Sequence, residues 1–445
     1  MPRIAIVLGA SIAGLLAARV LAPHFERILL IERDTLSATP DYRSGTAQAQ
    51  HAHILLRRGL LGIERLLPGY IETTIQAGGV VTNATRDWFT LFPMGEFPRF
   101  DSDFEFLCAT RPLLEHTLRQ CLLAQFTNIS LRDNCRLLKL TLAADSNAKV
   151  TLQTPDNDTP ELLTADLVVD ATGRNSHTPT ELLQQGFDQV RTTEVMPYLG
   201  YATRRYTQVT LPPTIHAAII MAKDPHMTRG GVLLPVENNQ YICTLYGFSK
   251  DYPATDEAGF LAFAQSLRSD LIYQAIVAAQ AQTPIKAFIK NTGSYRHYAE
   301  TGIWPQNFLV LGDAVCSFNP IYGQGISAAL QATEALAKTL QNTNINNPKW
   351  AKKAQRKIVN AYLAPWTIST NEDRRWPGTG NVRAGLILGA MHRFSDRIGV
   401  AATHDPHIAY TYIRVLHMMA HPAALLTPNM LMRLLRSGLG STPQQ

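Results

Sequence analysis

The chain has 445 residues, of which 46% are hydrophobic and 17% charged; this composition is typical of a globular protein with more than one core and excludes a disordered one. The formal net charge of +6 is modest, and no segment interleaves basic with aromatic residues, which excludes a typical nucleic-acid-binding protein. The first apolar run begins at Ile4, and no run reaches the roughly 18 apolar residues of a membrane-spanning helix. The five cysteines are scattered without metal-ligand spacing, which favours free thiols in a reducing compartment, so we expect a cytoplasmic protein.

The first predicted element is a buried parallel strand at Ile4–Leu8, because all its residues are apolar and several are β-branched. A short turn follows, and Leu15–Leu21 then has the composition of a helix. In dinucleotide-binding proteins such a turn carries three glycines and holds the pyrophosphate at the helix N-terminus. Ser11 replaces the middle glycine here. The candidate cofactor contacts in this turn are Gly9, Ser11, Ala13 and Gly14.

A second apolar strand, Ile28–Ile31, ends in Glu32, close to the spacing of about 20 residues at which an acidic side chain binds the adenosine ribose. These elements predict a dinucleotide site; the alternative is a structural turn with an ordinary strand-end carboxylate. We include the adjacent Arg33 among the candidate cofactor contacts. Arg43 and Arg111 are further candidates, because a guanidinium offers a rigid fork of donors to phosphate or ribose, although each could form a surface salt bridge instead.

Two histidines, His51 and His53, follow in the same segment. Residues two apart share a face only on a strand, and no cysteine or carboxylate cluster lies nearby, so we expect no metal site. We expect both histidines to line the cofactor pocket or to fix its loop. The other candidates for a substrate pocket, each of which could equally be an ordinary core residue, are Trp88, Met94, Met196 and Tyr201.

Residues 187–289 are predicted to form most of a second domain. Within it, residues 231–246 have the pattern of a β-hairpin whose turn, Asn238–Asn239, tolerates positive φ. An antiparallel sheet built around this hairpin could cover the cofactor and enclose a substrate.

Asn307–Leu311 is predicted to form another buried strand, and it leads into Gly312 and Asp313. A carboxylate there could accept hydrogen bonds from the ribityl hydroxyls of a flavin. Further on, a predicted helix at 326–332 would direct its N-terminus at the negative charge of a reduced flavin. A nicotinamide dehydrogenase needs only the first site, so the two sites together predict FAD; the alternative is a connection whose glycines only make turns. The candidate contacts here are Gly312, Asp313, Pro320, Gly323, Gln324 and Gly325.

The sequence resembles the FAD-dependent group A monooxygenases, the aromatic-hydroxylase-like flavoproteins, through Gly9–Glu32, Arg111–Glu115 and Gly312–Gly325. The resemblance implies an α/β fold in which a Rossmann-like FAD-binding domain is interleaved with an antiparallel β-sheet substrate domain and followed by a helical C-terminal region. The implied boundaries are 1–75, 101–186 and 290–340 for the FAD-binding domain, 76–100 and 187–289 for the substrate domain, and 341–445 for the helical region.

Two more blocks refine this resemblance. Ala165–Arg174 has the Ala-Thr-Gly form of flavin epoxidases, halogenases and isoprenoid reductases, so we do not expect Asp170 to contact a nicotinamide. Arg43–Leu56 is similar to a segment of polyketide-type and squalene-type flavin epoxidases, with Ala47 where that pattern has proline.

The resemblance therefore implies a monooxygenase of secondary metabolism, driven by NADPH or NADH, that transfers one oxygen from O2 to a small apolar substrate through a flavin hydroperoxide. Alkene epoxidation and aromatic hydroxylation are the expected reactions, and Gly323 and Gly325 would leave room for the peroxide. An FAD-dependent reductase of isoprenoid double bonds and a non-catalytic flavin-binding protein are the alternatives. After a polar linker at 341–348 the sequence is mainly helical; residues 421–439 are expected to pack on the protein body, with peripheral membrane contact as the alternative.

Overall fold

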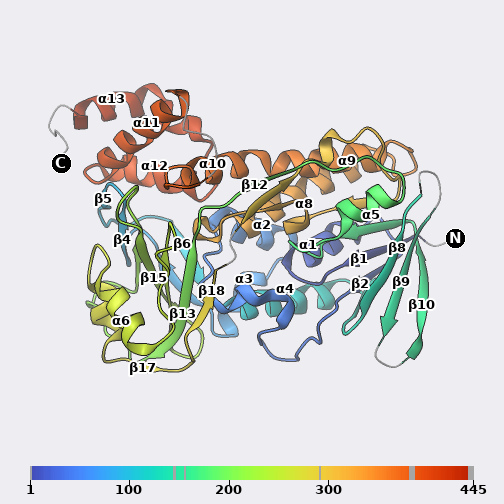
Figure 1. Ribbon diagram of the computed structural model, residues 1–445, viewed down its shortest axis with the longest axis horizontal. Coiled ribbons are helices and arrows are strands. Elements are labelled where there is room, and N and C mark those ends of the chain that lie inside the picture. Colours follow the sequence, from blue (N-terminus) through green and yellow to red (C-terminus); the bar gives the residue numbers. More distant parts are fainter. Residues whose placement is uncertain (1–2, 144–146, 155–156, 290–291, 380–385, 439–445) are drawn as a thin grey trace.

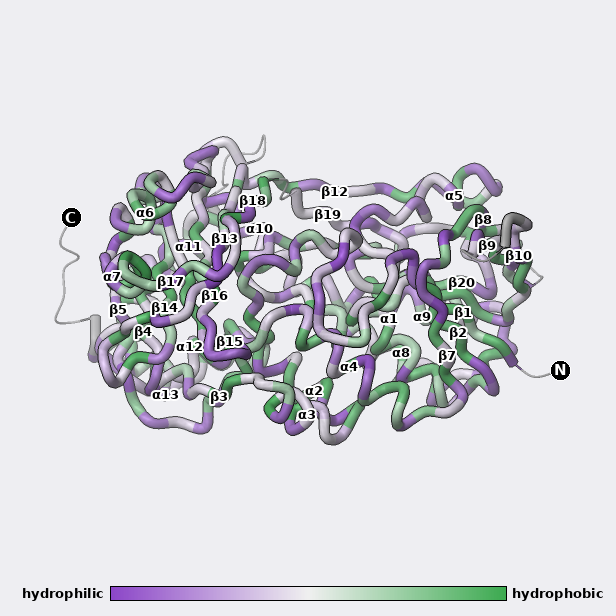
Figure 2. The backbone as a smooth tube through the Cα atoms, turned by 90° about the horizontal axis from the view of Figure 1, so that it is seen from below, coloured by the Kyte–Doolittle hydropathy of each residue, from purple (hydrophilic) through white to green (hydrophobic). Residues whose placement is uncertain are grey.

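In the computed structural model, a five-stranded parallel sheet forms the centre of the cofactor-binding half of the molecule (Figure 1). The structure describes residues 3–143, 147–154, 157–289, 292–379 and 386–438. The strands, in spatial order, are β20 (Phe308–Val310), β11 (Leu167–Asp170), β1 (Ile4–Leu8), β2 (Arg27–Ile31) and β7 (Ile129–Arg132). Figure 2 shows hydrophobic stretches along β1 and β2, as expected for central parallel strands that are covered on both faces.

Helices from distant parts of the sequence cover this sheet. They are α1 (Ile12–Leu21), α2 (Arg57–Leu66), α3 (Tyr70–Gln76), α4 (Arg111–Gln125), α8 (Gly325–Asn342) and α9 (Trp350–Ala361). Helix α8 packs against both α1 and α9, so the helices that follow the two predicted cofactor turns are neighbours. The start of α4 is set locally: the Thr110 hydroxyl accepts a hydrogen bond from the N–H of Leu113, and Pro112 occupies the first turn.

A mixed eight-stranded sheet forms the other half of the molecule. Its strands are β17 (Gln280–Ala281), β13 (Gly200–Thr207), β16 (Gln240–Gly247), β15 (Arg229–Val236), β14 (Ala217–Ile220), β4 (Trp88–Phe92) and β5 (Gly95–Glu96), with β18 (Lys286–Phe288) beside β13. The predicted hairpin is confirmed as β15–β16, and Asn238 and Asn239 in its turn have φ of 63° and 54°. All the pairs are antiparallel except β14–β4, and β4 enters the sheet from a separate segment of the chain.

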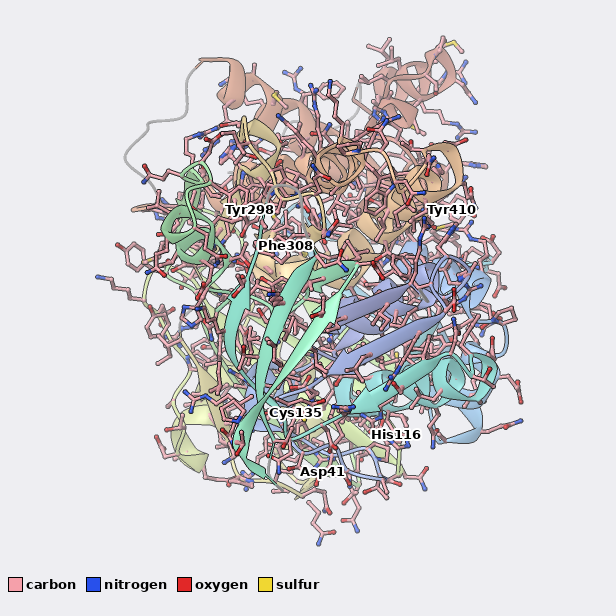
Figure 3. All side chains as sticks on the ribbon, turned by 90° about the vertical axis from the view of Figure 1, so that its right-hand side faces the viewer. Asp41, His116, Cys135, Tyr298, Phe308 and Tyr410 are labelled. Atoms are coloured by element: carbon pink, nitrogen blue, oxygen red, sulfur yellow. The ribbon has the colours of Figure 1, made fainter. Side chains whose placement is uncertain are left out.

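Three small sheets complete the α/β fold. One consists of β8 (Arg136–Thr141), β9 (Ala148–Thr154) and β10 (Asn157–Ala165), which lie at the end of the molecule that faces the viewer in Figure 3. The other two are β12 (Thr192–Val195), β19 (Gly293–Arg296) and β21 (Cys316–Ser317), and the pair β3 (Val80–Asn83) and β6 (Glu105–Cys108). The remaining helices are α5 (Thr178–Gln184), α6 (Glu257–Gln265), α7 (Leu271–Ile276), α10 (Leu363–Asp373), α11 (Leu386–Ala402), α12 (Pro406–Leu416) and α13 (Pro428–Gly438).

The C-terminal helices cover one face of the eight-stranded sheet. Ile398 of α11 and Ile408 of α12 share a buried cluster with Trp88 of β4, whereas Phe260 of α6 and Ile272 of α7 are buried on the opposite face. The helical region is therefore an integral layer of the fold (Figure 1).

The segment 421–438 packs on this layer through part of its apolar surface. Met430 is buried in the same cluster, as the prediction of packing on the protein body requires. Several apolar side chains nevertheless stay exposed, namely Leu426, Leu431, Met432 and Leu435. Among the described residues, no helix combines the length and the hydropathy needed to span a bilayer.

Candidate functional site

The first glycine turn leaves no room for side chains at two of its positions. Gly9 has a φ of 96°, its N–H donates to the carbonyl of Ile31 at 2.7 Å, and a Cβ placed there would lie 2.5 Å from the carbonyl oxygen of Ala171. A Cβ on Gly14 would lie 1.8 Å from the carbonyl oxygen of Gly9. Only glycine therefore allows strand β1, the turn and helix α1 to pack this closely, which is the role that the dinucleotide-binding pattern assigns to these positions.

Ser11 stands directly before α1 but does not cap it. Its hydroxyl donates to Oε2 of Glu115 at 2.5 Å and accepts from Nη2 of Arg111 at 3.0 Å. The first turn of α1 contains no acidic residue. Its backbone N–H groups are consequently available to an anion such as a pyrophosphate.

Glu32 organises the backbone around the end of β2. Its Oε2 accepts a hydrogen bond from the N–H of Ala10 at 2.9 Å, and its Oε1 accepts from the N–H groups of Arg33 and Asp34 at 2.9 and 3.1 Å. The Glu32 side chain is buried, whereas that of Arg33 is 61% exposed. Arg33 thus contributes its backbone, and its guanidinium lies largely in solvent.

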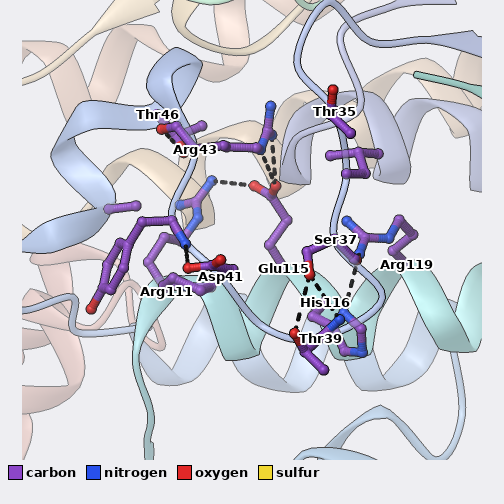
Figure 4. Close-up of a pocket in the computed structure, with 14 residues that line it drawn as sticks. Thr35, Ser37, Thr39, Asp41, Arg43, Thr46, Arg111, Glu115, His116 and Arg119 are labelled. Carbon is purple, nitrogen blue, oxygen red and sulfur yellow. Dashed lines mark hydrogen bonds and ion pairs between the residues drawn. The ribbon is translucent and has the colours of Figure 1, made fainter. Parts of the chain in front are cut away.

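Arg43 lies among three carboxylates, as Figure 4 shows for its bonds to Glu115. Its guanidinium contacts Glu115 at 2.6 Å, Glu32 at 3.0 Å and Asp34 at 3.2 Å. Arg111 approaches the other oxygen of Glu115 at 3.5 Å. Although burial opposes ionisation of Glu115, the charges of Arg111 and Arg43 keep the pKa of its carboxyl below the ordinary value. The predicted arginines are thus joined through a glutamate that the sequence reasoning missed.

The spacing of Arg111 and Glu115 could have revealed this contact, because residues four apart lie on the same face of a helix. The cluster borders a pocket of about 160 Å³ between α4 and the chain segment that follows β2. The charged residues on its wall are Asp41, Arg43, Arg111, Glu115 and Arg119.

The second glycine turn packs directly on the first. Gly312 has a φ of 70°, and a Cβ placed on it would lie 2.7 Å from the Cβ of Ala13. Within the described part of the chain, the partly buried carboxyl of Asp313 accepts no hydrogen bond, so it is available to a ligand hydroxyl. Burial raises the pKa of Asp313, while the charges of Arg174, Arg111 and Arg296 act against that rise.

The segment before α8 provides open space and unpaired polar groups. Pro320 begins a short 3-10 turn, and Gly323 follows it with a φ of 63°. A Cβ placed on Gly325 would meet no heavy atom within 4 Å. No side chain caps α8, and its first turn contains no acidic residue.

Two buried polar atoms, Oε1 of Gln324 in the segment before α8 and Nε of Arg111 at the start of α4, have no hydrogen-bond partner among the described residues. Two uncapped helix N-termini, tightly packed glycine turns, open space at Gly325 and unpaired polar atoms are the features that a long, anionic, hydrogen-bonding cofactor requires. The residues present therefore fit FAD.

His51 connects the segment after Arg43 to the eight-stranded sheet. Its Nδ1 is 2.8 Å from the hydroxyl of Thr203, and the N–H of the next residue, Ala52, donates to the hydroxyl of Thr244 at 3.0 Å. The imidazole also meets the ring of Tyr201 edge-on, with 4.4 Å between the ring centres. Burial, reinforced by the charge of His53, lowers the pKa of His51 to about 3, so the ring is neutral at ordinary pH.

His53 lies within the electrostatic reach of Arg111, one of the predicted cofactor contacts. Its Nδ1 is 2.9 Å from the carbonyl oxygen of His51, and burial together with the charge of Arg111 lowers its pKa to about 4. Tyr201 in turn stacks on Phe288, a residue that the sequence reasoning missed, with 5.6 Å between ring centres.

The other three candidates for a substrate pocket lie elsewhere. Trp88 is in the core beneath the C-terminal helices, where its indole N–H donates to the hydroxyl of Thr82 at 2.8 Å. Met94 packs on Gly399 of α11, and Met196 is 45% exposed. Of the proposed pocket residues, the structure brings together His51 and Tyr201, with His53 next to them.

Asp170 is fully occupied within the protein. One carboxylate oxygen accepts hydrogen bonds from the N–H and hydroxyl of Thr172, and the other accepts from the hydroxyls of Ser176 and Thr178. This carboxylate shapes the turn after β11.

The fold is that of a flavoprotein. The chain belongs to the family described as FAD binding domain, whose model matches residues 3–345. It is 29% identical over 363 residues to Protein Rv3254 of Mycobacterium tuberculosis. The aligned region covers 76% of this chain and 73% of that protein.

Two solved structures share the fold over nearly their whole length. The flavin-dependent brominase Bmp2 superimposes with a TM-score of 0.65 and 13% identity, covering 98% of each chain. The p-nitrophenol 4-monooxygenase PnpA of Pseudomonas putida DLL-E4 superimposes with a TM-score of 0.63 and 15% identity, covering 93% of this chain and 97% of that one. The predicted flavoprotein fold, shared by monooxygenases and halogenases, is thereby confirmed.

Proposed function

We propose that this protein is an FAD-dependent monooxygenase that uses NADPH or NADH and O2 to insert one oxygen atom into a small apolar substrate. One observation carries the proposal: the loop of the second cofactor site packs against a cluster of apolar and aromatic side chains. Ile321, two residues before Gly323, packs in a cluster with Tyr201, Phe288 and Tyr246. A flavin held at Gly325 would therefore adjoin apolar side chains.

The residues proposed to hold FAD come from both glycine turns and from the arginine cluster. The first turn would bind the pyrophosphate at the N-terminus of α1, with Glu32 facing the adenosine ribose and Arg111 close to the phosphates. Asp313 would accept hydrogen bonds from the ribityl chain, and the N-terminus of α8 would face the flavin ring. When bound, FAD supplies hydride acceptance and the activation of O2.

The protein's own contribution is to orient the substrate and to exclude water. In this cluster Tyr201 and Tyr246 are almost fully buried, and Phe248 stacks on Trp376 with 4.2 Å between ring centres and 7° between ring planes. The neutral His51, which meets Tyr201 edge-on, contributes a dipole without adding a charge next to this cluster. A dry site of this kind suits a reactive oxygen donor and an apolar substrate.

Alkene epoxidation is the reaction that we propose first, on the resemblance of Arg43–Leu56 to flavin epoxidases, and aromatic hydroxylation is the next. A cytoplasmic location fits the five cysteines, whose thiols are all buried and form no disulfide bond. The exposed apolar side chains of 426–435 could bring the protein to a membrane surface that contains an apolar substrate.

The experiment starts with the visible spectrum of the purified protein and then compares NADPH oxidation with and without O2 while alkenes and phenols are screened. A compound that stimulates O2 consumption and gains one oxygen atom in mass spectrometry supports the proposal. Reoxidation of the flavin by an alkene without O2 would identify a reductase instead. A bromide- or chloride-dependent gain of halogen would identify a halogenase, and a flavin that no reductant reduces would point to a non-catalytic protein.

A further inference from the structure

Helices α9 and α10 lie after residues 3–345, which the family model matches. Residues of these helices and of the junction between them form hydrogen bonds with three successive parts of the segment 310–322, which carries the second glycine turn. The side-chain amide of Gln355 in α9 pairs with the backbone of Val310, accepting at 2.8 Å and donating at 3.1 Å. The hydroxyl of Tyr362 accepts a hydrogen bond from the N–H of Gly312 at 2.9 Å. Figure 1 shows α10 between α9 and the other C-terminal helices.

The third point of contact is Asp373, at the end of α10. One oxygen of this buried carboxyl accepts hydrogen bonds from the side-chain amide of Asn319 at 2.6 Å and from the hydroxyl of Tyr322 at 3.0 Å. The carbonyl oxygen of the Asn319 side chain accepts a hydrogen bond from the N–H of Ile321 at 3.1 Å. Asp373 is therefore hydrogen-bonded at both ends of the 3-10 turn Pro320–Tyr322, to Asn319 directly before it and to Tyr322 at its end.

The position of this turn determines where the glycines lie. Gly323 follows Tyr322 directly, and a Cβ placed on it would lie 3.2 Å from the carbonyl oxygen of Ile54, so the loop is confined on that side as well. Gly325 then begins α8. A small movement of the turn would carry the uncapped N-terminus of α8 with it.

The carboxyl of Asp373 forms no ion pair among the described residues, although charged residues lie next to it on the chain. Its two hydrogen-bond donors are uncharged, and the neighbouring Glu372 is paired with Arg375 at 2.8 Å, which also contacts Asp396 at 3.0 Å. Arg374, on the same helix, lowers the pKa of Asp373, whereas Glu372 raises it. Burial dominates and raises the pKa of Asp373 to about 7.

We propose that Asp373 is a positioning residue, which, through Asn319 and Tyr322, fixes the turn that presents Gly323–Gly325 to the flavin. The role rests on the FAD site of the proposed function, but it does not depend on which reaction follows. The carboxyl of Asp373 is buried and accepts hydrogen bonds from two uncharged donors, Asn319 and Tyr322. Its ionisation therefore changes the strength of both hydrogen bonds and, with it, the position of the turn.

The test uses the full-length protein and measures the Kd for FAD and the visible spectrum of the bound flavin between pH 5.5 and 8.5. The wild-type protein should show a transition near pH 7 in both quantities. Asp373→Asn, which keeps an acceptor oxygen but cannot ionise, should bind FAD without that transition. Asp373→Leu, which removes both hydrogen bonds, should weaken FAD binding about tenfold across the range.

Glu372→Gln is the matched control, because Glu372 lies on the same helical turn and pairs with Arg375. It should retain the transition but move it to lower pH, because Glu372 raises the pKa of Asp373. Tyr322→Phe removes a hydrogen bond that lowers the pKa of Asp373, so it should move the transition to higher pH. If Asp373→Leu does not fold, Asp373→Asn and Tyr322→Phe decide the question.

A wild-type transition that persists in Asp373→Asn, or an unchanged Kd in a folded Asp373→Leu, would overturn the positioning role. Its failure is distinguishable from that of the proposed function. A protein that shows the Asp373-dependent transition but oxygenates none of the compounds screened would retain the positioning role and lose the monooxygenase proposal.

Discussion

Replacing Gly325 should separate cofactor binding from protein stability. An added Cβ would meet no heavy atom of the protein within 4 Å, and alanine favours helices more than glycine does. Gly325→Ala should therefore leave the thermal unfolding of the apoprotein unchanged or slightly raised. If the flavin fills the open space beside Gly325, the added methyl group should clash with it. The steric cost of about 1–3 kcal/mol in the binding free energy would weaken FAD binding roughly 5- to 140-fold.

The assay is titration of the apoprotein with FAD, followed by flavin fluorescence, alongside thermal unfolding followed by circular dichroism. Gly312→Ala is the control: its φ is 70° and its Cβ would clash with Ala13 at 2.7 Å, so this variant should lose both stability and FAD affinity. The larger Gly325→Leu should also oxidise NADPH without a matching yield of product. Wild-type FAD affinity in both Gly325 variants would refute the placement of the flavin at the N-terminus of α8.

Three further predictions concern charged and titrating groups. Glu32→Gln should weaken FAD binding about tenfold, because a charged hydrogen-bond acceptor is lost. Arg33→Ala should bind FAD normally, because the side chain of Arg33 is 61% exposed. Equal effects of the two variants would contradict the assignment of Glu32 to the adenosine ribose. The pKa of Asp373 is raised from 3.8 to about 7, so its contribution to stability is complete below pH 3.8 and is lost as the pH rises to about 7. Urea unfolding at about pH 5 to 8 should therefore show a free energy of unfolding that falls with pH in the wild type, and Asp373→Asn should reduce that slope by up to about 1.4 kcal/mol per pH unit. The pKa of His51 is lowered from 6.5 to about 3, so wild-type stability should fall as the pH drops below 6.5, and His51→Gln should reduce that loss in the same measurement. An equal loss in His51→Gln would contradict a buried, neutral imidazole.

Much of the cofactor-binding half could be predicted from the sequence, because its signals are local. The short, β-branched apolar run Ile4–Leu8, followed directly by a glycine turn, favours a buried parallel strand. Gly9 and Gly14 are required because the strand, the tight turn and the helix touch there. The hairpin turn at Asn238–Asn239 was equally visible, because few other residues tolerate positive φ.

The substrate-pocket candidates show where this local reasoning stops. Trp88, Met94 and Met196 have the composition of a pocket, yet the first two contribute to packing beneath α11 and α12, and the third is half-exposed. An apolar residue suits a core and a pocket equally well, so the hydrophobic pattern cannot distinguish between them.

The sequence by itself determined the flavoprotein class, because each glycine turn is specified by residues that are neighbours along the chain. Only the tertiary structure decided that Gly312 packs on Ala13, that Glu115 joins Arg43 to Arg111, and that Asp373 grips the turn before α8. These contacts join residues from distant parts of the chain, and the hydrogen bonds and packing that select them exist only once the sheets and the C-terminal helices have come together.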